Sequence, residues 1–293
     1  MSKFAFRSRV PRPPLDRVVA QLWWADGQIP YTADHLLPMA GAVLVVLLRD
    51  PFSTRLAGGR PDVHRHGWLT GPRQTAVVNR PLGRTRAVGA VFRTAGAAAV
   101  LGVPADATTG TAIAIDDLLG ADAGRLRDDL DAAPAWHDEL DRFEVFLRSR
   151  LDPELGRLRR VERAVTMLAT PARPSITGLA ADLGITVQHL GREFRHWVGL
   201  SPRWIVRLAR LQGLLDAIDT RDDVPWGALA FQFGYADQAH LSREFRALTA
   251  LTPTGYVRRR SAVYGPLPPG SQTLFVPLAG DVHCVQDRRR SPA

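Results

Sequence analysis

Short apolar runs separated by turn residues make up the first half of the chain. An apolar piece covers residues 18–24, and strand-like runs follow at 36–37, 43–48, 75–78 and 87–92. Turn signals such as Gly71-Pro72 stand between them. Several short strands at this spacing predict a β-sandwich or a barrel.

Other patterns frame these strands. Residues 10–14 (VPRPP) predict an extended arm, and residues 95–101 turn alanine-rich. Between 116 and 147 the apolar residues recur at helical spacing. We therefore expect a β-rich domain over residues 1–150, with helices leading out of it.

The second half of the chain contains an internal repeat. Residues 179–184 (LAADLG) return as 229–234 (LAFQFG), and residues 190–195 (LGREFR) return as 241–246 (LSREFR). The offset changes from 50 to 51 between these stretches, so the second copy has one extra residue there. Each copy has the pattern of a helix-turn-helix module, with the extra residue in the turn.

Helix boundaries are marked in both copies. Gly184 and Gly234 suit the left-handed conformation that ends a first helix. A plain helical bundle is disfavoured by these glycines, by the caps and by the paired Arg-Glu-Phe-Arg. The expected N-cap residues are, in chain order, Ser175, Thr186, Asp223 and Asp237.

With Leu and Phe turned inward, the second helix of each copy presents a polar outer face. In helix-turn-helix proteins the N-terminal part of this helix reaches the bases, where Gln and Arg pair with adenine and guanine edges. Phosphate would repel Glu193 and Glu244, so these should turn towards neighbouring helices. The expected DNA contacts are Val187, Gln188, Gly191, Arg192 and Arg195, then Gln238, Ala239, His240, Ser242, Arg243 and Arg246.

A long helix is predicted between the copies. It starts at Ser201-Pro202, and its apolar spacing continues to Ile218. At ~1.5 Å per residue it forms a rod of about 25 Å. Since successive major grooves lie ~34 Å apart, the rod plus the module widths would place both recognition helices in adjacent grooves. Phosphate contacts are expected from Arg203, Arg207 and Arg210, and from a last helix that runs from 252 to 260 and includes Arg259.

Charge concentrates in the same region. The chain has 38 Lys plus Arg against 29 Asp plus Glu, a formal net charge of +9, and Lys3 is its one lysine. Residues 157–260 alone hold 16 Arg and 9 Asp plus Glu, a surplus of seven. A basic surface suits nucleic acid, an anionic membrane or an acidic partner, and its position here favours DNA.

Two stretches carry a resemblance to a known family: residues 234–246 (GYADQAHLSREFR) and 251–256 (LTPTGY). With them, residues from about 155 to 261 resemble the DNA-binding domain of AraC/XylS-family transcriptional regulators. The resemblance implies seven helices, two helix-turn-helix modules and base contacts from the exposed positions named above. Gly191 departs from the family pattern, where a larger polar residue is common, which would shift base reading to Gln188 and Arg192.

The first half also resembles known proteins. Residues 37–52 and 96–103 are similar to a β-rich domain that precedes this module in many actinobacterial-type regulators, which implies ligand sensing or association. The expected class is α+β: a β-rich barrel- or sandwich-like domain with helices (1–150), an all-α DNA-binding domain (151–261) and a Pro-rich tail (262–293). In the tail, residues 274–278 are expected to form a strand that packs back on the body, and 288–290 (RRR) a solvated terminus.

Few residues suggest catalysis or a metal site. His35, His64 and His66 are candidate ligands, but no further ligand follows at a short fixed spacing, so no metal is expected. The carboxylates at 139, 141 and 144 share a helix with Arg142 and Arg148, which predicts a solvated, salt-bridged face.

The remaining candidates favour packing over chemistry. Trp23 and Trp24 are expected in the core or at a sheet edge rather than in a ligand pocket. Cys284 is the one cysteine, so internal disulfides are excluded and a free thiol in a reducing cytosol is expected. No apolar run reaches 18 residues and no signal-peptide pattern occurs, so we expect a cytoplasmic protein with no membrane partner.

Together these features predict a sequence-specific, DNA-binding transcriptional regulator of the AraC type, without enzymatic activity or cofactor. Its expected partner is double-stranded DNA, with RNA polymerase, an unknown small-molecule effector and a second copy in a homodimer as further candidates. The alternatives are a DNA-targeted enzyme or metal-binding barrel carrying a helix-turn-helix module, and an interaction protein that has lost DNA binding. The single cysteine disfavours a zinc-dependent repair enzyme, and the retained Gln and Arg residues disfavour the loss of DNA binding.

Overall fold

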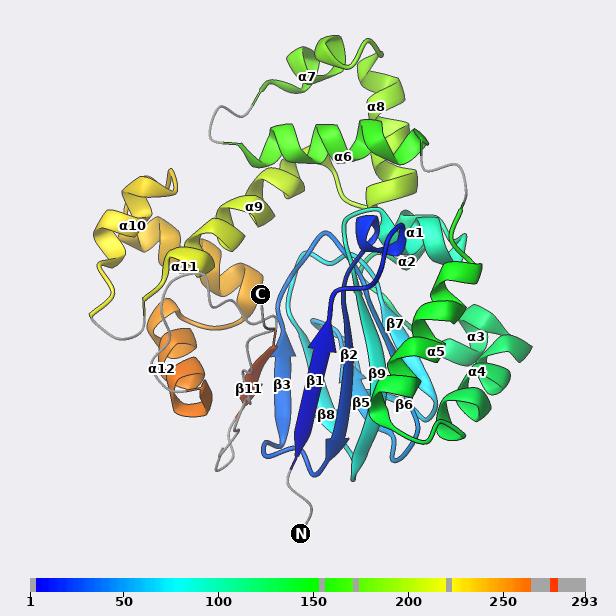
Figure 1. Cartoon of the computed structure of the whole chain (residues 1–293). Helices are drawn as coiled ribbons and strands as arrows, with labels where there is room; N and C mark the ends of the chain where they lie inside the picture. Colours follow the sequence, from blue (N-terminus) through cyan, green and yellow to red (C-terminus); the bar gives the residue numbers. More distant parts are fainter. Residues whose placement is uncertain (1–3, 153–155, 171–173, 220–222, 265–274, 279–293) are drawn as a thin grey trace, which may run out of the picture.

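The structure is a computed structural model that describes residues 4–152, 156–170, 174–219, 223–264 and 275–278. A β-rich first half is followed by a helical second half (Figure 1). The predicted α+β class is therefore confirmed. None of the helices in these ranges is long and apolar enough to cross a membrane.

Two antiparallel sheets form the first half, which we call the β-sandwich. One sheet has the strand order β1 (Ala5–Arg9), β2 (Val19–Gly27), β9 (Thr85–Phe92), β4 (Val43–Leu47), β7 (Gly67–Thr70) and β10 (Ala112–Ala114). The other has the order β11 (Phe275–Leu278), β3 (Ala33–Leu36), β8 (Val77–Pro81), β5 (Phe52–Arg55) and β6 (Asp62–His64). Every strand pair in both is antiparallel.

Strand β4 shows how the layers are stacked. All five of its residues are buried, because alternate side chains point to opposite faces and both faces are covered. Val43 and Val45 join the core between the sheets, together with Phe52 and Val77 of the second sheet. Leu44 lies in a different core, shared with the helices that cover the outer face. The arrangement is sandwich-like.

The predicted helical stretch 116–147 is three helices. They are α3 (Ile115–Leu119), α4 (Ala121–Asp131) and α5 (Trp136–Ser149), which lie along the first sheet (Figure 1). Gly120, with φ of +56°, separates α3 from α4. The alanine-rich stretch forms α1 (Gly96–Leu101), and α2 (Ala105–Thr108) follows it.

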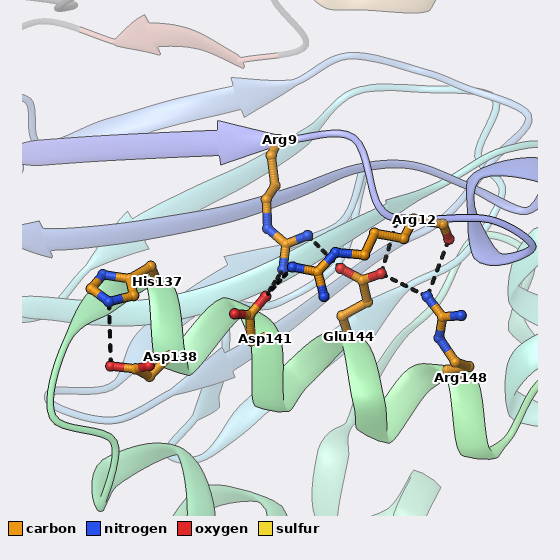
Figure 2. Close-up of polar contacts among 7 residues, drawn as sticks. All are labelled: Arg9, Arg12, His137, Asp138, Asp141, Glu144 and Arg148. Carbon is orange, nitrogen blue, oxygen red and sulfur yellow. Dashed lines mark hydrogen bonds and ion pairs between the residues drawn. The ribbon is translucent and has the colours of Figure 1, made fainter. Parts of the chain in front are cut away.

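The acidic face of α5 corrects the prediction of a solvated surface. Glu139 and Glu144 are each only 2% exposed, because this face of α5 packs against β2 and β9. Figure 2 shows Arg9 pairing with Glu144 and with Asp141, the latter at 2.6 Å. Arg148 lies 2.9 Å from Glu144. Only Asp141 keeps the expected half-exposed position.

These ion pairs anchor the N-terminal arm. The backbone N–H of Arg12 donates to Glu144 at 2.8 Å, which ties the arm to α5 (Figure 2). Burial alone would raise the pKa of Glu144, but the Arg12 N–H and the guanidinium groups of Arg9 and Arg148 outweigh it and lower the pKa. Glu139 instead accepts from Trp24 Nε1 at 3.1 Å and pairs with Arg86 at 3.0 Å. Trp23, as expected, lies in the core.

The described residues of the second half contain the helices α6 to α12. In chain order they are α6 (Gly156–Ala169), α7 (Ile176–Asp182), α8 (Val187–Glu193), α9 (Pro202–Ala217), α10 (Trp226–Gln232), α11 (Gln238–Thr249) and α12 (Pro253–Tyr264). A π-helical segment, Phe194–Val198, continues α8 directly. The predicted long helix is α9, which links the two helix-turn-helix units (Figure 1).

The hydrophobic core does not divide at residue 150. One buried cluster contains Val88 and Phe143 as well as Leu190 and Phe194 of the first repeat copy. A separate cluster holds the second copy, and Leu37 of the β-sandwich belongs to it. The domain limits at 150 and 261 therefore stay a prediction.

The tail returns to the body. Strand β11 pairs with β3, with Phe275 opposite Leu36, which confirms the predicted strand for residues 275–278. Leu274, Cys284 and residues 288–290 lie outside the described residues.

Candidate nucleic-acid interface

The first helix-turn-helix unit, α7 with α8, is built by the caps that the sequence predicts. The Ser175 hydroxyl accepts from the Gly178 N–H at 3.0 Å, and the Thr186 hydroxyl accepts from the His189 N–H at 3.1 Å. Gly184 has a φ of +67°, the left-handed conformation expected at the helix end. These three predictions are confirmed.

The second unit, α10 with α11, agrees except at its start. Asp237 caps α11 by accepting from the His240 N–H, and Gly234 has a φ of +71°. Asp223 does not cap α10, because the helix begins three residues later at Trp226, with Pro225 at the N-cap and no side-chain cap. That prediction was wrong: the stretch after Asp223 contains Pro225, which stands immediately before the helix.

The extra residue of the second copy is Ala236. Both turns begin alike, since Ile185 N–H bonds Ala180 O and the equivalent Tyr235 N–H bonds Ala230 O. The caps are then 51 residues apart, which leaves Ala236 as the insertion. Its N–H donates to His240 Nδ1 at 3.2 Å. The insertion therefore lies in the turn, as predicted.

Glu193 of α8 and Glu244 of α11 each turn towards a neighbouring helix, as expected. Glu193 accepts from Arg160 of α6 at 3.0 Å and lies 3.2 Å from His189. Glu244 accepts from Arg207 of α9 at 3.1 Å and lies 3.6 Å from His240. Each carboxylate is thereby neutralised beside the face that would meet DNA. Arg160 was not singled out by the sequence, since nothing in the pattern links it to α8.

The predicted DNA-contacting residues lie mostly at the surface. Gly191, Ser242 and His240 are partly buried, and His240 also stacks edge-on against Tyr235 with its ring already bonded to the turn. The exposed members are Val187, Gln188, Arg192 and Arg195 of the first unit and Gln238, Ala239, Arg243 and Arg246 of the second.

The arginines expected to bind phosphate fall into two groups. Arg203 and Arg258 are exposed. Arg207 stacks 4.1 Å from the Trp204 ring and pairs with Glu244, and Arg210 packs 5.0 Å from Tyr235, so these two stabilise the second unit.

The end of the last helix also departs from the expectation. Arg260 is 1% exposed beside the Tyr256 ring, at 5.9 Å. The charge of Arg259 reaches His35 of β3 and helps to lower its pKa. Helix α12 turns these arginines inward because it packs against the second unit and lies beside β11.

The candidate metal ligands do not come together. His35 and His64 are buried, and burial lowers the pKa of each. His64 stacks on Trp68 at 5.3 Å, whereas His66 is half-exposed and lies 3.0 Å from Asp116. Within the part of the chain that the structure describes, no group of three or more His, Cys, Asp or Glu side chains could hold a metal ion.

Comparison with protein families finds one match in each half of the chain. Residues 179–259 match the model of a helix-turn-helix domain. They form a helix-turn-helix domain of the AraC type, the class to which the two capped units and the long linking helix point. Residues 7–114, from β1 to β10, match a domain of unknown function, DUF6597.

Curated relatives and solved structures show further similarity. Two Mycobacterium tuberculosis proteins, from strains CDC 1551 and H37Rv and each named probable bifunctional transcriptional activator/DNA repair enzyme AlkA, are 33% identical over 104 residues. That match covers 35% of this chain and 21% of theirs, so the chain spans about a fifth of the length of these relatives.

Among solved structures, ToxT from Vibrio cholerae is 9% identical, covers 87% of this chain and 98% of its own, and has a TM-score of 0.47. A ToxT structure with bound unsaturated fatty acid is also 9% identical, with a TM-score of 0.45 over 87% of this chain and 94% of its own.

Proposed function

We propose that this protein is a sequence-specific DNA-binding transcriptional regulator that inserts α8 and α11 into successive major grooves. The observation that carries the proposal is the duplicated unit, in which the second helix of each copy presents a polar outer face without an unpaired carboxylate. In both copies the one acidic residue of the recognition helix is paired sideways, while Gln and Arg stay exposed. A surface of this kind attracts phosphate and offers side chains that read bases.

The reading residues follow from their place on each helix. Gln188 and Gln238 stand at the N-terminal end, next to the caps, where such helices approach base edges. Arg192 and Arg243 lie one turn further, at equivalent positions. We assign adenine contacts to the glutamines and guanine contacts to the arginines, because each side chain makes two parallel hydrogen bonds to that base.

Supporting contacts come from the rest of the surface. Val187 and Ala239 offer apolar contact to a thymine methyl group, and Arg195 and Arg246 extend the basic face. Arg203 of α9 and Arg258 of α12 are exposed and suit phosphate binding. Gly191, Ser242 and His240 complete the proposed set, with His240 positioned by its turn contact.

The β-sandwich and its helices would regulate this activity. We propose residues 1–150 as the regulatory domain and 151–261 as the DNA-binding domain. A small-molecule effector, RNA polymerase and a second copy of the chain are its proposed partners.

Selection of bound DNA from a random pool tests the proposal. Enriched sites should show two base clusters about one helical turn, roughly 10 base pairs, apart. Affinity should fall linearly with salt on a double-logarithmic plot. Recovery of a single cluster would contradict insertion of both helices, and no enrichment would contradict sequence-specific binding altogether. A metal analysis of the same preparation distinguishes the alternative of a metal-dependent enzyme.

A further inference from the structure

The first unit is held by the segment that follows α2. The Thr109 hydroxyl lies 3.1 Å from the carbonyl oxygen of Gly199 and 2.8 Å from that of Ala105, so it joins the end of the first unit to α2. Gly199 has a φ of +71°, and a Cβ there would come 2.1 Å from Thr109 Oγ1. The close approach therefore needs glycine both for its conformation and for its lack of a side chain.

The second unit is held by the β-sandwich at two places. The Ala76 N–H donates to the carbonyl oxygen of Leu248 at 3.0 Å, and His35 of β3 bonds the backbone of Thr249. Leu37, just after β3, belongs to the hydrophobic cluster of the second unit. Contacts from both the loop before β8 and the end of β3 therefore reach α11.

Both units contact the first half of the chain through the C-terminal end of their second helix. With the offset of 51 residues, Leu248 and Ala250 correspond to Trp197 and Gly199. The contacts fall at the C-terminal end of each recognition helix, where the last carbonyl groups lack partners within the helix. The opposite ends, with Gln188 and Gln238, stay free.

A chain of hydrogen bonds connects the two holding points. The Gly110 N–H donates to the carbonyl oxygen of Pro72 at 2.8 Å, and the Gly71 N–H donates to that of Thr111 at 3.3 Å. Arg73 then donates from Nη2 to the carbonyl oxygen of Leu37 at 2.8 Å. Thus one end of the path touches Gly199 and the other touches the second unit.

Arg73 is the unusual member of this path. It is 1% exposed, and burial lowers its pKa to about 9. Its side-chain hydrogen bonds go to backbone carbonyl groups, those of Leu37 and Gly71, and no carboxylate among the described residues pairs with it. A buried cation without a counter-charge lowers stability, so packing alone does not account for an arginine here.

We infer that the segments 71–76 and 109–111 form a brace that holds the C-terminal ends of the two recognition helices at a set separation, with Arg73 as its central positioning residue. The inference rests on the proposed function, because the separation matters only if both helices enter the same DNA. It assigns the β-sandwich a mechanical part in site selection: the brace sets how far apart the two base clusters lie.

A distance measurement tests the brace without DNA. Spin labels are attached through Asp182→Cys and Gln232→Cys, equivalent exposed positions in the two units, in a Cys284→Ser background. Arg73→Met should make the distribution of label-to-label distances about twofold broader, because the braced state then becomes one of several. Arg80→Met, an exposed arginine of β8, is the matched control and should leave the distribution unchanged.

A second variant covers the case in which Arg73→Met does not fold. Thr109→Val keeps the size of the side chain and removes the contact to Gly199, so it should broaden the distribution in the same way. Unchanged distributions in the folded variants would overturn the inference, whatever the protein does with DNA.

DNA binding provides the second readout. On a selected site the wild-type protein should lose affinity steeply when one to three base pairs are inserted between the base clusters. The variants should lose about tenfold at the original spacing, as expected if the binding-competent state is about a tenth populated, and should tolerate the insertions better. If the wild-type protein binds no DNA, the proposed function fails while the distance measurement still decides on the brace. Equal spacing profiles in wild type and variants would contradict the brace alone.

Discussion

The two helix-turn-helix units share a sequence pattern but differ in their surroundings. Leu190 and Phe194 of the first unit belong to the same buried cluster as the helices and outer sheet face of the first half. Leu241 and Phe245, at the equivalent positions, lie in a second, smaller cluster. Duplication therefore kept the unit and its inward stripe, whereas the neighbouring elements decided which core each unit joined.

The ends of the recognition helices differ as well. The first continues as a π-helical segment to Val198 and is followed by Gly199, whereas α11 stays α-helical to Thr249 and is followed by Ala250 in a left-handed conformation, with φ of +60°. An alanine in that conformation is unfavourable, yet the Thr249 hydroxyl donates to the Phe245 carbonyl oxygen and accepts from the Leu251 N–H, so it bonds the backbone on both sides of Ala250. Both helices are thus followed by a residue in the left-handed conformation, which is Gly199 in the first unit and Ala250 in the second.

The largest expected effect tests whether the two hydrophobic clusters are independent of each other. Phe194→Ala and Phe245→Ala should each cost about 3–5 kcal/mol, because both rings are fully buried. Hydrogen-exchange mass spectrometry should show faster exchange beyond the first unit, in α1 and α2, for Phe194→Ala. For Phe245→Ala the faster exchange should stay within the second cluster, that is residues 211–218 and 224–257 and the stretch around Leu37. The same pattern in both variants would show that the cores are not independent.

The next effect concerns base reading. Arg243→Ala should weaken binding to a selected site by about 1–3 kcal/mol and relax the preference at one base. Arg258→Ala is the control and should weaken all sequences alike, because Arg258 is exposed whereas the charge of Arg259 is directed at His35. The measurement is titration against a panel of single-base variants of the site. Unchanged affinity in Arg243→Ala would refute the assigned role of α11.

A smaller effect is expected at Gly191, which stands at the position that Ser242 occupies in the second copy. A Cβ at Gly191 would meet nothing within 4 Å, so a side chain fits there without strain. Gly191→Ala should raise the free energy of unfolding by up to about 1 kcal/mol, since glycine inside a helix is less favourable than alanine. Thermal unfolding measures this. A lower melting temperature would contradict the expectation that the added methyl group fits at this position.

The smallest expected effect is a pH dependence at the contact between His35 and the second unit. The lowered pKa of His35 arises first from burial and then from Arg259, with Arg55 also contributing and the Thr249 backbone opposing. A lowered pKa means that, as pH falls through the ordinary histidine range near 6.5, the unfolded chain binds a proton before the folded one. Stability is therefore lost towards pH 5.

His35→Gln should remove this loss. The variant should gain stability relative to wild type between pH 7 and pH 5, as measured by denaturant unfolding. Asp34, whose pKa burial raises to about 7, has the opposite slope but contributes equally to both proteins. His64→Gln should show a gain of the same sign, because burial also lowers the pKa of His64, at a site away from the second unit. A constant stability difference across this range would contradict the assignment.

Much of the helical half follows from the sequence. Caps at Ser175, Thr186 and Asp237, left-handed glycines and the inward stripe of Leu and Phe are local signals, and each depends on residues within about one or two helical turns. The start of α10 is the exception: Asp223 is a good local cap, but the helix begins after Pro225, at Trp226.

The sheet order, the buried carboxylates of α5 and the contacts of the two units with the β-sandwich depended on the tertiary structure. Glu139 and Glu144 read as solvated residues because their partners, Arg86 and Arg9, are more than 50 positions away in the chain. Arg73 carried no signal at all, since only the folded chain brings its loop to Leu37 and the second unit.

The sequence by itself determined the repeated unit, its helix ends and the residue types on its outer face, because short-range capping, periodicity and glycine conformation specify these. Only the tertiary structure decided which of the arginines stay exposed, which core each unit joins and where the β-sandwich holds them. Those outcomes depend on contacts between residues that lie far apart in the sequence. These contacts determine which side chains are buried and which ion pairs form.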